Sequence, residues 1–178
     1  HTRGKSVSFR PFRALAALGL FACVPAAQAE VFINEIHYDN AGTDSGERIE
    51  VVATAGESLS GWRIHLYNGT GSTTAATAYD NDPLPTGALA TCGGATVRFA
   101  TLSYAANGIQ NGTHDGIALV NPSGAVVQFI SYDGQIRASS GVASGRTSVN
   151  VPVSESEATA VGHSLQLAGT ASGSAGFT

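Results

Sequence analysis

Five carboxylates lie close together in the first third of the chain: Glu35, Asp39, Asp44, Glu47 and Glu50. The stretch 39–46 contains only Asp, Asn, Ala, Gly, Thr and Ser, which favours a flexible loop rich in oxygen atoms. Calcium binds about six to eight carboxylate, carbonyl and water oxygens. We therefore expect that calcium, if it binds, is held by Asp39, Asp44 and Glu47. The spacing does not match an EF-hand, and the alternative is a solvated acidic loop closed by Asx turns.

No pattern in the sequence pairs a nucleophile with a base. It has no G-x-S-x-G or S-x-x-K motif, and its single lysine is Lys5. Cys92 has no basic neighbour that would favour a thiolate. The histidines after His1 stand alone, without the spacing of a zinc site: His37, His65, His114 and His163. We expect no catalytic and no cofactor-binding residues, and a free-standing hydrolase has no group of residues to support it.

Short apolar stretches separated by Gly, Asn, Asp, Ser and Pro must position these side chains. In the stretch 47–51, Ile49 and Val51 share one face, whereas Arg48 and Glu50 share the other, as in a half-buried strand. No stretch shows helical periodicity. The sequence predicts an all-β antiparallel sandwich of about eight short strands. The expected strands span 31–38, 47–53, 62–67, 95–101, 116–120, 126–132, 147–151 and 164–167.

Three local features refine this picture. Pro122 and Gly124 predict a turn that folds the strands 116–120 and 126–132 into a hairpin. The stretch 69–92 is expected to form a long loop with one irregular edge strand. Trp62 is expected to fill the space between the two sheets, so that its truncation to Ala would cost about 3–5 kcal/mol.

The N-terminal residues resemble an export signal. Basic residues precede the uncharged apolar run 14–24, and small residues at Ala27 and Ala29 fit a signal-peptidase site. We expect residues 1–29 to be a signal peptide and the protein to be secreted, either extracellular or periplasmic. A lipoprotein signal with acylated Cys23 is the alternative, and it is the only case in which we expect membrane contact. The domain then spans 30–168, and 169–178 is a linker or a domain edge.

Removal of the leader makes the domain strongly acidic. Residues 30–178 hold five arginines and thirteen carboxylates, a formal net charge of −8. Such a surface repels a phosphate backbone, so direct nucleic-acid binding is not expected.

The ordered motifs Ile33-Asn34-Glu35-Ile36, Glu47-Arg48-Ile49-Glu50-Val51 and Leu59-Ser60-Gly61-Trp62 resemble the lamin tail domain. The later stretches 115–120 and 126–132 are similar to its bacterial secreted form, and the likeness covers residues 31–168. The resemblance implies an immunoglobulin-like sandwich. It departs from the family at Arg48, where an aromatic residue is usual.

The resemblance also implies a role. The bacterial form often stands N-terminal to a nuclease of the endonuclease/exonuclease/phosphatase type. We therefore expect an exported, non-catalytic accessory module that positions or docks a larger extracellular protein. The alternative is the N-terminal portion of a secreted nuclease, whose C-terminal catalytic domain would then be the partner. Nothing of such a catalytic domain is present in the sequence.

Overall fold

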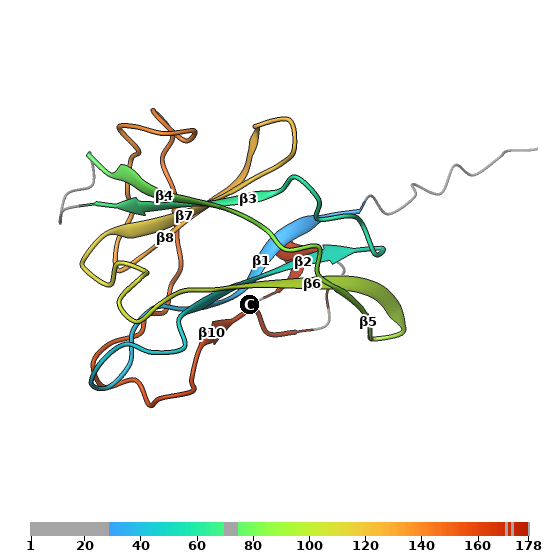
Figure 1. Cartoon of the computed structure of the whole chain (residues 1–178), viewed down its shortest axis with the longest axis horizontal. Helices are drawn as coiled ribbons and strands as arrows, with labels where there is room; N and C mark the ends of the chain where they lie inside the picture. The colour runs from blue at the N-terminus through green and yellow to red at the C-terminus, as the bar shows by residue number, and fades with distance from the viewer. Residues whose placement is uncertain (1–28, 70–74, 170, 172, 178) are drawn as a thin grey trace, which may run out of the picture.

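The computed structural model describes residues 29–69, 75–169, 171 and 173–177, and two β-sheets packed face to face form its body (Figure 1). One sheet has the order β10-β1-β2-β6-β5 and the other β4-β3-β7-β8-β9. The strands are β1 (Val31–His37), β2 (Arg48–Thr54), β3 (Arg63–Asn68), β4 (Thr77–Pro83), β5 (Ala88–Cys92), β6 (Ala95–Ser103), β7 (Asp115–Val120), β8 (Val126–Tyr132), β9 (Val149–Asn150) and β10 (Leu165–Gln166). The predicted β-sandwich is confirmed, with ten strands in the described residues, of which β8 and β9 pair in parallel.

Helical structure is confined in the described residues to the short 3-10 turn η1 (Ser174–Gly176). The described part of the chain therefore holds no helix of the length and apolarity that crossing a membrane requires. The predicted signal peptide and Cys23 lie outside the described residues, except for Ala29.

The apolar alternation of the strands produces the core between the sheets. In β2, Ile49 and Val51 are fully buried, whereas Arg48 and Glu50 are only partly covered, as predicted. Strand β7 is buried on both faces because it lies between β3 and β8 and a second apolar cluster covers its outer face. The rings of Tyr38 and Tyr132 stack at 3.9 Å between centroids, deep in the core. This core fixes the ends of β1 and β8, from which the functional loops extend.

The predicted hairpin is confirmed. The Gly124 amide donates to the Asn121 carbonyl at 2.9 Å, and Gly124 has a φ of 81°, which favours glycine. Asn121 Oδ1 also accepts from the amides of Ser123 and Ala125 at 3.1 and 2.9 Å. These bonds hold β7 and β8 in the register that opposes Ile117 to Ile130.

The stretch 69–92 differs from the expectation of one irregular edge strand. It contains two strands, β4 and β5, one at the edge of each sheet. Pro83 is the last residue of β4, where a missing amide does not interrupt a central ladder. Both strands are largely exposed. They therefore lack the buried apolar face whose alternating residues would have predicted a strand from the sequence.

The prediction for Trp62 is confirmed in part, because the side chain packs against the core but is not fully buried. Trp62 precedes β3, in a turn where its amide donates to the Leu59 carbonyl at 3.2 Å. Its side chain is partly buried and packs against the core cluster that contains Ile64 and Leu66. Ile64 and Leu66 of β3, which belong to that cluster, are buried.

The position of Trp62 changes the expected cost of truncating it. Because Trp62 is only partly buried, Trp62→Ala should lower the free energy of unfolding by about 1–2 kcal/mol, less than the truncation of a fully buried residue would. Urea unfolding monitored by circular dichroism measures this loss. A loss above about 3 kcal/mol would show that the ring is a core residue.

Two further details concern the outer face of the first sheet. Arg48 forms an ion pair with Glu35 at 2.7 Å, so its charge has a partner on the neighbouring strand. Residues of the predicted linker lie on this sheet: the Phe177 ring is 5.9 Å from that of Phe32, and Ser174 is hydrogen-bonded to Glu30.

Candidate functional site

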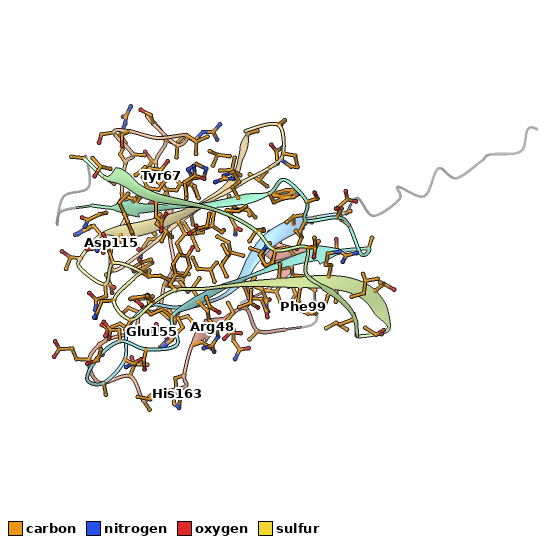
Figure 2. All side chains as sticks on the ribbon, viewed as in Figure 1. Arg48, Tyr67, Phe99, Asp115, Glu155 and His163 are labelled. Carbon is orange, nitrogen blue, oxygen red and sulfur yellow. The ribbon has the colours of Figure 1, made fainter. Side chains whose placement is uncertain are left out.

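Loops from three parts of the chain meet at one end of the sandwich. In Figure 2, Asp115 and Glu155 lie at this end, on the left of the view. The Ala41 amide donates to the Thr159 carbonyl at 2.8 Å, and the Asn111 side-chain amide donates to Asp44 Oδ2 at 2.7 Å. The β1–β2 loop is therefore tied to both the β6–β7 loop and the segment after β9. We call this region the acidic end: Asp39, Asp44, Glu47, Asp115 and Glu155.

Glu155 holds the acidic end together. Its Oε2 accepts hydrogen bonds from the amides of Tyr38 and Asp39 at 2.6 and 3.1 Å. Its own amide donates to the Tyr38 hydroxyl at 2.8 Å, and its Oε1 lies 2.9 Å from His37 Nδ1. The side chain is almost fully buried. Glu155 therefore clamps the end of β1 from more than a hundred residues away in the sequence.

His37 is the positive partner of Glu155. Its Nε2 lies 3.2 Å from both the Ser45 carbonyl and Asn40 Oδ1, and a carbonyl only accepts, so Nε2 donates. Nδ1 donates to the carboxylate on the other side, which makes His37 an imidazolium. Burial lowers the pKa of His37, but the hydrogen bond and charge of Glu155 outweigh it and raise the pKa above 6.5.

The three predicted calcium ligands are all buried, but they do not converge. Glu47 binds the protein itself: its Oε2 accepts from the Gly108 amide at 2.7 Å and its Oε1 from the Ile109 amide at 3.2 Å. Asp44 Oδ1 accepts from the Asn40 amide at 3.1 Å, and Asp39 Oδ1 has no hydrogen-bond partner among the residues that the structure describes. Burial and the adjacent Asp44 raise the pKa of Asp39 to about 6.

A metal site of three ligands is not formed as predicted. Within residues 29–69, 75–169, 171 and 173–177, no three His, Cys, Asp or Glu side chains gather in a group able to hold a metal ion. The structure brings Asp39 and Asp44 together and assigns Glu47 to the β6–β7 loop. The loop is closed by side-chain hydrogen bonds of longer span than the predicted Asx turns: Asn40 Oδ1 accepts from the Ser45 amide at 3.1 Å. Calcium binding at the loop stays a prediction.

Asp115 is a further buried carboxylate that the sequence did not indicate. Its Oδ1 accepts from the Gly69 amide at 3.0 Å, and its Oδ2 has no partner in the described structure. Burial raises its pKa to about 6. Next to it, His114 has a φ of 70° and a buried Nδ1 without a partner. No described side chain activates a nucleophile here; Cys92 is exposed on β5, away from the predicted loop.

These pKa shifts predict that the domain is more stable at acidic pH. Asp39 and Asp115 titrate near pH 6 when folded and near 3.8 when unfolded, so the folded state binds more protons between these values. Stability therefore falls as pH rises through this window, and His37, whose pKa is also raised, continues the fall above pH 6.5. We expect the free energy of unfolding in chelator to be about 2 kcal/mol greater at pH 5 than at pH 8. Urea unfolding at both pH values measures it, and equal or greater stability at pH 8 would contradict it.

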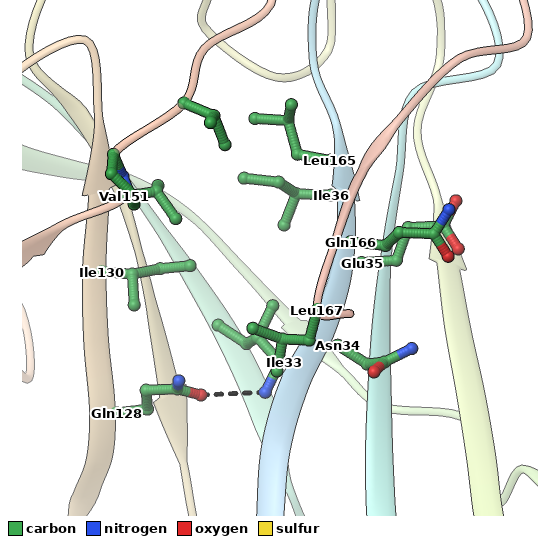
Figure 3. Close-up of a pocket in the computed structure, with 12 residues that line it drawn as sticks. Ile33, Asn34, Glu35, Ile36, Gln128, Ile130, Val151, Leu165, Gln166 and Leu167 are labelled. Atoms are coloured by element: carbon green, nitrogen blue, oxygen red, sulfur yellow. Dashed lines mark hydrogen bonds between the residues drawn. The ribbon is translucent and has the colours of Figure 1, made fainter. Parts of the chain in front are cut away.

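The second candidate surface is an apolar groove on the open side of the sandwich, between β1 and β8. Its volume is about 250 Å³. Figure 3 shows side chains of β8 and the segment after β9 facing those of β1 and β10, with Gln128 Oε1 accepting from the Ile33 amide at 2.8 Å. The apolar side chains of the groove are Ile33, Ile36, Ile130, Val151, Leu165 and Leu167, with Pro152 and Val153 at the same opening.

Strand edges border this groove. β10 pairs with β1 only at Glu35 and Ile36, and β9 pairs with β8 only at Ile130 and Ser131. Among the described residues, no strand pairs with the outer edge of β8 over residues 126–129. The groove therefore combines apolar side chains with an open strand edge.

Comparisons of the chain with models of protein families, with curated proteins and with solved structures found no match.

Proposed function

We propose that this chain is an exported, non-catalytic accessory module of the lamin tail type, which docks a larger extracellular protein. The observation that carries the proposal is the apolar groove beside the open edge of β8. The fold and the ordered motifs of the sequence support the lamin tail assignment. The acidic end supports a structural role, because its buried carboxylates bind backbone amides and His37.

The groove suits an extended segment of the partner protein. A strand added to the edge of β8 gains main-chain hydrogen bonds, while its alternate side chains enter the pocket between Ile36 and Ile130. Since the domain carries a formal net charge of −8, basic residues flanking the apolar segment would speed association. The partner is therefore a protein with an exposed, extended apolar segment. If the chain is the N-terminal portion of a secreted nuclease, that segment belongs to the same polypeptide.

A library of displayed peptides tests the docking function. We expect selected peptides to alternate apolar and polar residues and to carry basic flanks. Val153→Asp, at the 55 % exposed rim of the groove, should weaken their binding at least tenfold. Val161→Asp, the same change at a 66 % exposed valine outside the groove, is the matched control and should leave binding unchanged. Equal effects of the two variants, or none, would contradict docking in the groove.

The non-catalytic part of the proposal has its own test. Phosphodiester cleavage needs a positioned metal or base beside groups that stabilise phosphate charge, and residues 30–178 contain no lysine. The purified protein should leave plasmid DNA intact with magnesium, manganese or calcium. Metal-dependent nicking that disappears in Asp39→Asn would make the acidic end an active site and overturn the proposal.

A further inference from the structure

The carboxylate of Asp39 lacks a counterion. Asp39 is 7 % exposed, and its Oδ1 is buried without a hydrogen-bond partner. The ion pairs of the described residues are Arg48 with Glu35 and His37 with Glu155, so neither basic group is left for Asp39. The neighbouring charges are the carboxylates of Asp44, Glu155 and Glu157, all of the same sign.

A buried carboxylate with an unpaired oxygen is costly unless a proton or a cation compensates it. A second carboxylate next to the first raises this free-energy cost at neutral pH, because the two negative charges repel each other. The surrounding turn is rich in oxygen, and His37 uses both ring nitrogens within the protein. A set of oxygen ligands suits a hard divalent cation. It does not suit zinc, which is usually held by Cys and His side chains.

We propose that Asp39 and Asp44 bind a divalent cation, best matched by calcium, that stabilises the β1–β2 loop. Asp39 Oδ1 is the principal ligand, because no protein group uses it. Asp44 keeps lone pairs beyond those that accept from Asn40 and Asn111. Water would supply the remaining ligands, because no third carboxylate gathers with these two among the described residues.

The site differs from the one expected from the sequence, because Glu47 uses both of its oxygens within the protein. It is also weak, since only two buried carboxylates are fixed in place. Sites of this kind in extracellular modules have dissociation constants of roughly 0.1–1 mM. The proposal is independent of docking in the groove, which uses another face of the sandwich.

Terbium luminescence and thermal unfolding test the site in the purified protein at pH 7.5. Tyr38, next to Asp39 in the chain, is a ring that can sensitise bound terbium. We expect tyrosine-sensitised terbium emission that calcium displaces, and a melting temperature higher in millimolar calcium than in chelator. Magnesium, which demands a stricter octahedral geometry, should give a smaller rise.

Two variants that each remove one carboxylate charge test whether the cation binds at Asp39. Asp39→Asn should weaken terbium binding at least tenfold and abolish the calcium-dependent rise in melting temperature. Glu57→Gln removes one charge at an exposed residue before β3 and should leave both unchanged. A melting temperature that responds to pH but not to calcium would show that a proton alone compensates Asp39, and it would overturn the proposal. An undiminished calcium response in Asp39→Asn would overturn it as well.

Discussion

Glu155→Ala is expected to lower the free energy of unfolding by about 4 kcal/mol, the largest effect of any single carboxylate. The change leaves the buried His37 imidazolium without its counterion at Nδ1. It also leaves the amides of Tyr38 and Asp39 without an acceptor in a region that water scarcely reaches. Each buried, unsatisfied donor adds about 1–3 kcal/mol of cost. Urea unfolding in chelator measures the loss.

Glu157→Ala is the matched control for Glu155→Ala. Glu157 is two residues further along the chain and exposed, so its truncation in chelator should change stability by less than about 0.5 kcal/mol. A loss below about 1 kcal/mol in Glu155→Ala would mean that water reaches His37 and the two amides. The clamp between the segment after β9 and the end of β1 would then be absent in solution.

Glu47→Ala is expected to cost about 3 kcal/mol. Glu47 is fully buried just before β2, and its two oxygens accept the amides of Gly108 and Ile109. The loss of both acceptors would release the β6–β7 loop from the first sheet. Burial raises the pKa of Glu47, and the hydrogen bonds from the two amides lower it. These hydrogen bonds therefore offset part of the free-energy cost of burying the charged carboxylate.

The same variant separates a structural Glu47 from a metal ligand. Glu57→Ala, at an exposed site, should be nearly neutral in the same urea assay. If Glu47→Ala removed the calcium response but cost less than about 1 kcal/mol in chelator, Glu47 would be a ligand, as the sequence alone had suggested.

The strands that the sequence predicted are those with a buried apolar face. The alternation of Ile49 and Val51 marks β2, and the turn residues around Pro122 mark the hairpin of β7 and β8. Strands β4 and β5 were not distinguished within 69–92, because edge strands need little apolar surface to pair with a neighbour. The positions of β4 and β5 depend on their pairing with β3 and β6. A local sequence pattern does not specify this pairing.

The acidic end was visible in the sequence only in part. Asp39 and Asp44 lie five residues apart in one loop, so local spacing is enough to bring them together. Glu155 reaches the same place through packing of the segment after β9, a long-range contact with no local signal. Glu47 was assigned to the metal because its neighbours in sequence are acidic, whereas a loop sixty residues later takes both its oxygens.

His37 shows the same limit. As an isolated histidine on a strand, it had no sequence feature to distinguish it from an ordinary core or surface residue. Its charge follows from two acceptors on opposite sides of the ring, Glu155 and the Ser45 carbonyl. Only the fold brings these acceptors together.

Amide hydrogen exchange of the protein with a selected peptide bound tests the docking proposal most directly. Strand addition predicts slower exchange along the open edge of β8, at residues 126–129, and at Ile33, whose amide donates to the Gln128 side chain across the groove. The β1–β2 loop, residues 40–46, should keep its exchange rates. Protection confined to that loop, or to the outer face around Phe32 and Phe177, would contradict docking in the groove.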